Sequence, residues 1–221
     1  KQRINIILDM LKTSSTDLAA DDLDKLMKEL KDLADGSEVT SIGTFAFSST
    51  TDLIRVTLPA SLTTLGDRAF AGCVNLEEIL VESGNTAFAS ENGILYNADK
   101  TTVLVVPQSL IEVALADICT TIATYAFDSM PKLIALNTNK VQTIKQNAFY
   151  NCSNLMSLTF GRELTTIEDD AFKSCTKVMS VVVEGIINKG QRSAVPSIGL
   201  SMGPSSWEGK LNVYVPQSDL N

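Results

Sequence analysis

Residues Leu53–Phe70 read LIRVTLPASLTTLGDRAF, and the Ala-Phe dipeptide that ends this stretch is one of five that occur in the same sequence pattern along the chain. Successive phenylalanines of these dipeptides are 23, 57, 22 and 23 residues apart, and they are Phe47, Phe70, Phe127, Phe149 and Phe172. A fixed period of this length is typical of proteins built from stacked structural repeats. We therefore align the sequence on the five phenylalanines.

The alignment produces four columns around each phenylalanine, and all of their members except Thr138 are apolar. The column five residues before it contains Ile42, Leu65, Ile122, Ile144 and Ile167. The column six residues after it contains Leu53, Leu76, Leu133, Leu155 and Val178. The column nine residues after it contains Val56, Ile79, Leu136, Leu158 and Val181. The column eleven residues after it contains Leu58, Val81, Thr138, Phe160 and Val183. The alternation in the last two columns predicts a short strand with one face inward. Only the next unit can cover the apolar edge of each unit, so the units are predicted to stack as a solenoid.

The repeat resembles the BspA-like class of leucine-rich repeats, a bacterial surface type. The match is carried by Leu58-Pro59, Leu65-Gly66 and Ala69-Phe70, with Gly72-Cys73 following, and it covers about residues 39–184. The resemblance implies an α/β repeat solenoid, a right-handed leucine-rich-repeat superhelix with short parallel strands. A column of hydroxyl residues before the isoleucine column is expected to form a stacked ladder, and its members are Ser41, Thr64, Thr121, Thr143 and Thr166.

The two ends of the chain depart from the repeat, as the ends of a solenoid must. Residues 1–38 are predicted to form an N-terminal helical cap, because leucines recur at helical spacing from Leu18 to Leu33 and Asp35-Gly36 then ends the pattern. A fragment of an upstream domain and a partner-binding helix are the alternatives. Residues 39–184 form the predicted solenoid, and residues 185–221 a C-terminal loop and capping strand. Within this last part, 185–210 read as an irregular loop and 211–216 as the final strand.

The 57-residue spacing exceeds one period and indicates an enlarged coil at about residues 84–117. Two apolar runs there flank the tetrapeptide Asn97–Lys100, which predicts a β-hairpin. Inserts of this form are common in the family that the repeat resembles. We expect the insert to stay in the stack as an elaborated coil.

Composition excludes several functional classes before any motif is considered. The 221 residues contain no histidine, which removes the commonest general base and the commonest zinc ligand. The formal net charge of −8 and the scattered basic residues disfavour a nucleic-acid surface. No run approaches the roughly 18 apolar residues that a membrane span needs, so we expect no transmembrane segment in this chain. We predict no enzyme activity, no catalytic residues, no metal and no cofactor.

The four cysteines are Cys73, Cys119, Cys152 and Cys175, and all of them fall on inward-facing columns of the repeat. Their spacing contains no metal-binding pair. We therefore expect buried, inert thiols, although Cys152 and Cys175 would lie in neighbouring coils where a disulfide is conceivable.

A binding face is predicted where strand residues alternate with the core columns, because these residues line one continuous surface of a solenoid. They are Arg55, Thr57, Glu78, Leu80, Glu82, Ala135, Asn137, Asn139, Ser157, Thr159, Ser180, Val182 and Glu184. The column seven residues after each phenylalanine is also unusual, since it contains Ile54, Glu77, Ile134, Met156 and Met179. This column forms either a partner-binding stripe or packing beneath adjoining loops.

The expected function is a non-enzymatic binding or adhesion module that recognises a protein or a glycan. The resemblance implies a bacterial location, secreted or anchored at the cell surface, and Lys1 in place of methionine leads us to expect a processed or trimmed chain. The alternative is a structural spacer or a self-assembly subunit of a surface complex.

Overall fold

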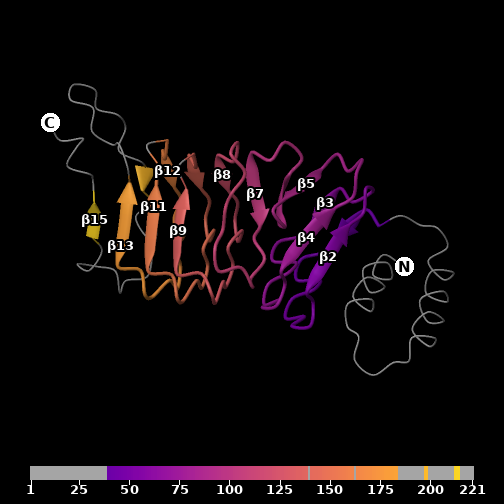
Figure 1. Cartoon of the computed structure of the whole chain (residues 1–221), viewed down its shortest axis with the longest axis horizontal. Coiled ribbons are helices and arrows are strands. Elements are labelled where there is room, and N and C mark those ends of the chain that lie inside the picture. Colours follow the sequence, from indigo (N-terminus) through magenta and orange to yellow (C-terminus); the bar gives the residue numbers. More distant parts are fainter. Residues whose placement is uncertain (1–38, 139, 162, 184–196, 199–211, 215–221) are drawn as a thin grey trace.

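The computed structural model describes residues 39–138, 140–161 and 163–183, together with the strand residues 197–198 and 212–214. The described part is built from short strands and turns stacked along one long axis (Figure 1). It contains no helix, so the α/β description is wrong for these residues and the coils are all-β. The predicted helical cap at residues 1–38 lies outside the described residues.

Two series of parallel strands run along the solenoid. The main strands are β2 (Arg55–Leu58), β4 (Glu78–Val81), β9 (Ala135–Thr138), β11 (Ser157–Phe160), β13 (Ser180–Val183) and β15 (Asn212–Tyr214). The return strands, two residues each, are β1 (Ser41–Ile42), β3 (Thr64–Leu65), β8 (Thr121–Ile122), β10 (Thr143–Ile144), β12 (Thr166–Ile167) and β14 (Ser197–Ile198). The parallel-strand solenoid predicted from the repeat is therefore confirmed, and Figure 1 shows β9, β11, β13 and β15 side by side.

The pairing register follows the sequence alignment. Thr143 pairs with Thr121 on one side and with Thr166 on the other, which confirms the stacked hydroxyl column across these three coils. The main strands keep the same register, with Leu158 opposite Leu136 and Val181. Each column member therefore lies beside its counterpart in the next coil, as a solenoid requires.

The repeat phenylalanines form the centre of the core. The rings of Phe127 and Phe149 are stacked with centroids 4.6 Å apart, and those of Phe149 and Phe172 are 4.9 Å apart. Phe47 and Phe70 form a separate stacked pair with centroids 5.5 Å apart. All five side chains are buried. The stack is thus divided in two at the position of the insert.

Each Ala-Phe turn is bracketed by two residues in the left-handed backbone region. The first lies two residues before the phenylalanine and the second two residues after it, as Arg68 (φ 55°) and Gly72 (φ 77°) illustrate around Phe70. The same pair of positions has positive φ in all five units. A left-handed residue ends any right-handed helical turn, so the Ala-Phe turn cannot continue as a helix.

The insert forms the predicted hairpin and a third strand. Strands β6 (Ile94–Asn97) and β7 (Thr102–Val105) are antiparallel, and β5 (Phe88–Glu91) pairs with the other edge of β6. Strand β7 then pairs in parallel with β8, with Thr102 opposite Thr121. The insert therefore continues the series of return strands, as expected for an elaborated coil.

The C-terminal part contains a short strand, β14, that the sequence did not lead us to expect. Strand β14 pairs with β12 and lies within the segment 185–210, which we expected to be irregular throughout. The sequence Ser197-Ile198-Gly199 repeats Ser41-Ile42-Gly43, and this was the available signal. No Ala-Phe dipeptide follows Ser197-Ile198-Gly199, so the alignment on the phenylalanines did not include this segment. The predicted terminal strand is confirmed as β15, which pairs with β13.

Candidate binding surface

The residues of the predicted binding face lie on the main strands, but not on one continuous sheet. Strands β2 and β4 form one sheet, and β9, β11, β13 and β15 form another. Between them, Gly93 at the tip of the β5–β6 hairpin accepts a backbone hydrogen bond from Ile79 of β4 (2.8 Å). The insert therefore covers the edge of β4 and divides the predicted face into two.

The two parts of the face differ in charge. On β2 and β4 the described members are Arg55, Thr57, Glu78 and Leu80, and Glu82 directly follows β4. Arg55 forms an ion pair with Glu78 directly opposite. On β9, β11 and β13, all described members are uncharged: Ala135, Asn137, Ser157, Thr159, Ser180 and Val182. Asn139 and Glu184 lie outside the described residues.

An exposed apolar stripe runs beside the uncharged sheet. Ile134, Met156 and Met179 are 53%, 40% and 59% exposed. Their backbones are adjacent, because Met156 N donates to Ile134 O (2.7 Å) and Met179 N donates to Met156 O (2.9 Å). Ile54 in the same column is 42% exposed. The described loops therefore leave this column exposed.

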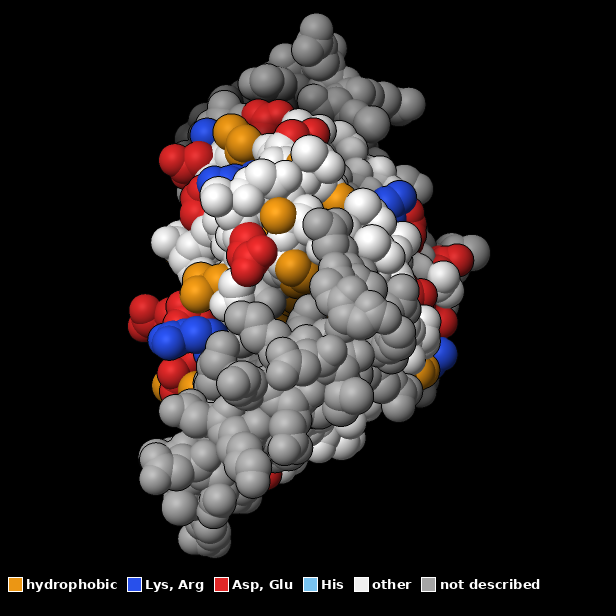
Figure 2. Space-filling model, turned by 90° about the vertical axis from the view of Figure 1, so that its right-hand side faces the viewer, with side chains coloured by type: hydrophobic (Ala, Val, Ile, Leu, Met, Phe, Trp, Pro, Cys, Tyr) orange, Lys and Arg blue, Asp and Glu red, His pale blue; other side chains and the backbone are white. Residues whose placement is uncertain are grey.

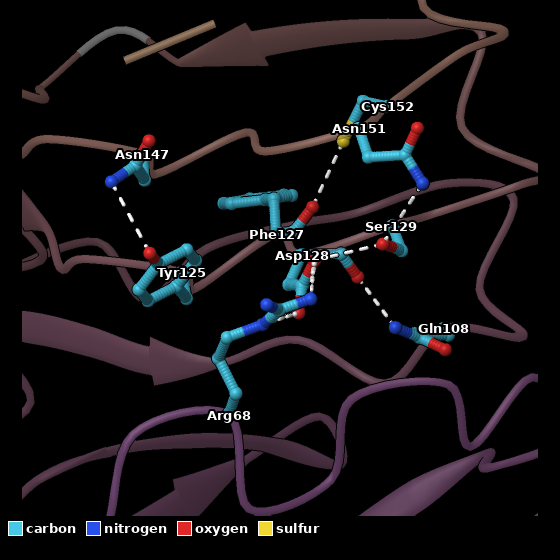
Figure 3. Close-up of polar contacts among 9 residues, drawn as sticks. All are labelled: Arg68, Gln108, Tyr125, Phe127, Asp128, Ser129, Asn147, Asn151 and Cys152. Atoms are coloured by element: carbon cyan, nitrogen blue, oxygen red, sulfur yellow. Dashed lines mark hydrogen bonds and ion pairs between the residues drawn. The ribbon is translucent and has the colours of Figure 1, made fainter. Parts of the chain in front are cut away.

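A charged clamp, Arg68 with Asp128, joins the two halves of the solenoid. Arg68 Nε donates to Asp128 Oδ2 at 2.7 Å, and the Asp128 side chain is only 5% exposed. Two further groups hold Asp128, since Ser129 Oγ donates to its carboxylate (2.8 Å) and Gln108 Nε2 donates to its backbone carbonyl (Figure 3).

Aromatic rings surround the guanidinium group of Arg68. The Arg68 Cζ lies 5.2, 5.1 and 5.0 Å from the ring centroids of Phe45, Tyr125 and Tyr150. These distances are within the range of cation–π contacts. Sequence reasoning missed this cluster, because Phe45, Arg68 and Tyr125 share a column whose chemistry varies from unit to unit.

The four cysteines are buried thiols, as predicted. Three of the thiols form hydrogen bonds between neighbouring coils of the core. The Cys152 thiol donates to Phe127 O at 2.9 Å (Figure 3). In the same way, the Cys73 thiol donates to Phe47 O and the Cys175 thiol donates to Phe149 O. A hydrogen bond with the Cys175 thiol and burial raise the pKa of Cys152 well above its ordinary value. Thiols held in the protonated form are poor nucleophiles and poor metal ligands.

The buried thiols predict a loss of stability at alkaline pH. Burial raises the pKa of Cys73 from 9.0 to about 11, so the unfolded thiol ionises while the folded thiol keeps its proton. Between these two values the folded state binds more protons, and the free energy of unfolding must fall as pH rises. Each such thiol lowers it by about 1.4 kcal/mol per pH unit once the unfolded thiol is ionised.

Urea unfolding at a series of pH values from 8 to 11 measures this loss. The variant Cys73→Ala removes one of the titrating groups, so its stability should fall less steeply above pH 9.0 than that of the parent. Equal slopes for the two proteins would show that Cys73 does not contribute.

The described residues offer no centre for metal chemistry, because no group of three His, Cys, Asp or Glu side chains among them could hold a metal ion. No helix in the same residues is long and apolar enough to cross a bilayer.

Figure 2 looks at the end of the solenoid from the right-hand side of Figure 1, and there basic and acidic side chains lie interspersed.

The repeat, the strand register and the bracketed Ala-Phe turns together identify the family. The sequence pattern described as "BspA type Leucine rich repeat region" matches residues 27–113 and 107–195 in six copies. The chain belongs to this family. The matched residues begin before the first Ala-Phe unit and end at residue 195, just before β14.

Two solved structures are similar to this chain. The chain is similar to the pneumococcal vaccine antigen PcpA, with 21% identity and a TM-score of 0.53 over 83% of this chain and 50% of that one. It is also similar to a leucine-rich cell-surface protein from Faecalibacterium prausnitzii, with 22% identity and a TM-score of 0.49 over 78% and 54%. This leucine-rich-repeat chain thus spans about half the length of both. A search of curated proteins found no match.

Proposed function

We propose that this leucine-rich-repeat chain is a non-enzymatic binding module of the bacterial cell surface and that its partner is a protein. The exposed apolar stripe of Ile134, Met156 and Met179 carries the proposal. These side chains lie on adjacent coils, so they form one contiguous surface rather than scattered positions. Contiguous exposed apolar surface is characteristic of interaction sites.

The neighbouring sheet supports a protein partner over a glycan. The described side chains on the outer face of β9, β11 and β13 are small and uncharged, and none of them is aromatic. Such a face has no ring on which a sugar could stack. A partner protein would instead cover the methionine and isoleucine side chains, and methionine adapts its shape well to an apposed surface. We expect the stripe to form the centre of the interface and the uncharged sheet to form its rim.

A panel of purified extracellular-matrix proteins and glycans tests the proposal by thermal shift and by titration. At least one protein should bind, and Met156→Glu should weaken its affinity at least tenfold, because the variant places a charge at the centre of the apolar stripe. The control is Ile111→Glu, which changes an exposed isoleucine (63%) away from the stripe and should leave the affinity unchanged.

Two further results would contradict the proposal. One is protein binding that Met156→Glu leaves intact but that Arg55→Ala or Glu78→Ala abolishes, which would assign the interface to β2 and β4. The other is a mass that rises with concentration in light scattering and falls back to the monomer in Met156→Glu. The second result would establish the self-assembly subunit in place of the binding module.

A further inference from the structure

The series of return strands is interrupted after β3. Strand β1 pairs with one edge of β3, and β1 is the only described strand whose Cα atoms come within 8 Å of β3. The next member of the series, β7, pairs with β6 and β8 instead. The second edge of β3 is therefore an open strand edge, and it lies between two coils of the described solenoid rather than at its end.

Elsewhere, the backbone of each return segment binds the next one in a constant pattern. Thr120 O accepts the N–H groups of Gln142 (2.7 Å) and Thr143 (3.1 Å), and Ile122 O accepts that of Lys145 (3.0 Å). The pattern is repeated one coil on, from Gln142 O and Ile144 O to the residues around β12. In the opposite direction, the phenylalanine N–H donates to the next coil, as in Phe127 N to Ala148 O (2.8 Å).

The equivalent groups beside β3 have no such partner among the described residues. They are the carbonyls of Thr63 and Leu65 and the N–H of Phe70. Thr63 is exposed and Leu65 is half-buried, so an added strand can reach this edge, which offers two carbonyl acceptors and one N–H donor. These groups occupy the same positions in their coil as Thr120 O, Ile122 O and Phe127 N, which bind the next coil in parallel register.

A groove lies along this edge. It has a volume of about 390 Å³, and residues 63–71 line one wall. Leu104 and Val105 contribute apolar surface from the opposite wall. Leu65 is partly exposed here, whereas the other members of its column are buried: Ile42, Ile122, Ile144 and Ile167. An apolar side chain placed opposite Leu65 would cover it in the way that Ile144 covers Ile122.

The Arg68–Asp128 clamp holds the two walls of the groove together. Both residues line it, Arg68 from the wall that contains β3 and Asp128 from the opposite wall. The close-up in Figure 3 shows the Arg68 side chain reaching from its own coil to Asp128. The groove is therefore preformed, which lowers the entropic cost of binding an extended ligand.

We propose that this groove is a second binding site, which takes an extended peptide segment of another protein by adding it as a parallel strand to β3. The N–H groups of the peptide would donate to Thr63 O and Leu65 O, and an apolar side chain would cover Leu65. Main-chain pairing of this kind supplies affinity, and the side-chain position supplies specificity. The site lies apart from the apolar stripe, and its test does not depend on the proposed function.

The chain itself supplies the probe peptide. Residues 142–148 have the sequence QTIKQNA, and within the solenoid their backbone provides the three N–H donors and the carbonyl that complement the equivalent edge of β8. A labelled synthetic peptide of this sequence, blocked at both ends, should bind the intact protein saturably. Amide resonances of residues 63–70 should shift on binding, as followed by NMR.

Two altered peptides separate strand addition from general stickiness. N-methylation at the position of Lys145 removes the N–H that would donate to Leu65 O and keeps every side chain. Ile144→Asp in the peptide removes the apolar side chain opposite Leu65 and keeps every backbone donor. Each change should weaken binding at least tenfold.

On the protein side, Leu65→Lys should weaken binding by a similar factor. Ile118→Lys serves as its control, because Ile118 is 56% exposed and lies outside the groove. Urea midpoints of both variants show whether each remains folded, and if Leu65→Lys is unfolded, Leu65→Ser takes its place.

Three results would overturn the proposal. The first is an absence of saturable peptide binding, and the second is binding that N-methylation leaves unchanged. The third is a shift of the same amide resonances by oligosaccharides in the absence of peptide binding, which would make the groove a glycan site.

Discussion

Phe149→Ala is expected to lower the free energy of unfolding by about 3–5 kcal/mol, the usual cost of deleting a buried aromatic side chain. Phe149 is fully buried and stacks on both Phe127 and Phe172. Its removal leaves a cavity at the centre of a column that spans three coils, and neighbouring coils fixed by their backbone ladders cannot close it. Equilibrium unfolding in urea measures the loss.

The exposed Phe45 provides the matched control for this change. Its side chain is 49% exposed and contacts Arg68 at one ring face, so Phe45→Ala should cost less than about 1 kcal/mol. A cost for Phe149→Ala as small as that of Phe45→Ala would contradict the stacked column as the centre of stability.

Arg68→Ala is expected to cost about 3 kcal/mol or more, because it leaves the Asp128 carboxylate buried without its cation. The same change removes the three ring contacts of the guanidinium group. Arg68→Lys should recover only part of the loss, since an ammonium group keeps the charge but cannot donate in the planar geometry of the clamp. Urea unfolding measures both variants.

A second substitution tests whether the loss comes from the clamp itself. The double variant Arg68→Ala/Asp128→Ala should be less destabilised than the sum of the two single variants, because the two side chains interact directly. The exposed pair of Lys173 and Asp170 serves as the surface control, and Lys173→Ala should cost less than about 1 kcal/mol. Additive costs for Arg68→Ala and Asp128→Ala would contradict the clamp.

The core of this solenoid could be predicted almost residue by residue. The buried side chains of Ile122, Ile144 and Phe149 were all assigned from the 22–23-residue period. Such assignment succeeds because one coil presents the same apolar positions to both neighbours, so the repeat in sequence becomes a repeat in space. The hairpin of the insert could also be predicted, since its turn and flanking alternation are local signals.

The candidate surfaces were only partly predictable. The column of Ile134, Met156 and Met179 was visible in the alignment, but the exposure that makes it a candidate interface depends on which loops lie over it. The Arg68–Asp128 clamp had no sequence signal, because its two residues are 60 positions apart and only their coils bring them together.

The helix content was the clearest error. The family resemblance implied an α/β coil, yet the described residues turn through left-handed positions such as Arg68 and Tyr125. Residues of these types rarely have a positive φ, so the sequence contains no signal that the chain forms a left-handed turn at these positions. Contacts between adjacent turns stabilise that conformation, as when Phe127 N donates to Ala148 O.

The period and the apolar columns, both legible in the amino-acid order, are sufficient to specify a stack of parallel coils and the contents of its core. Where that stack is interrupted depended on the folded chain. The spacing between Phe70 and Phe127 shows that one coil is enlarged, but many arrangements of an insert satisfy a length. The hairpin tip at Gly93 reaches β4, while β7 joins β8 and leaves the second edge of β3 open. Backbone hydrogen bonds between distant segments determine where the stack is interrupted. Because backbone groups are the same in every residue except proline, the order of side chains does not reveal these hydrogen bonds.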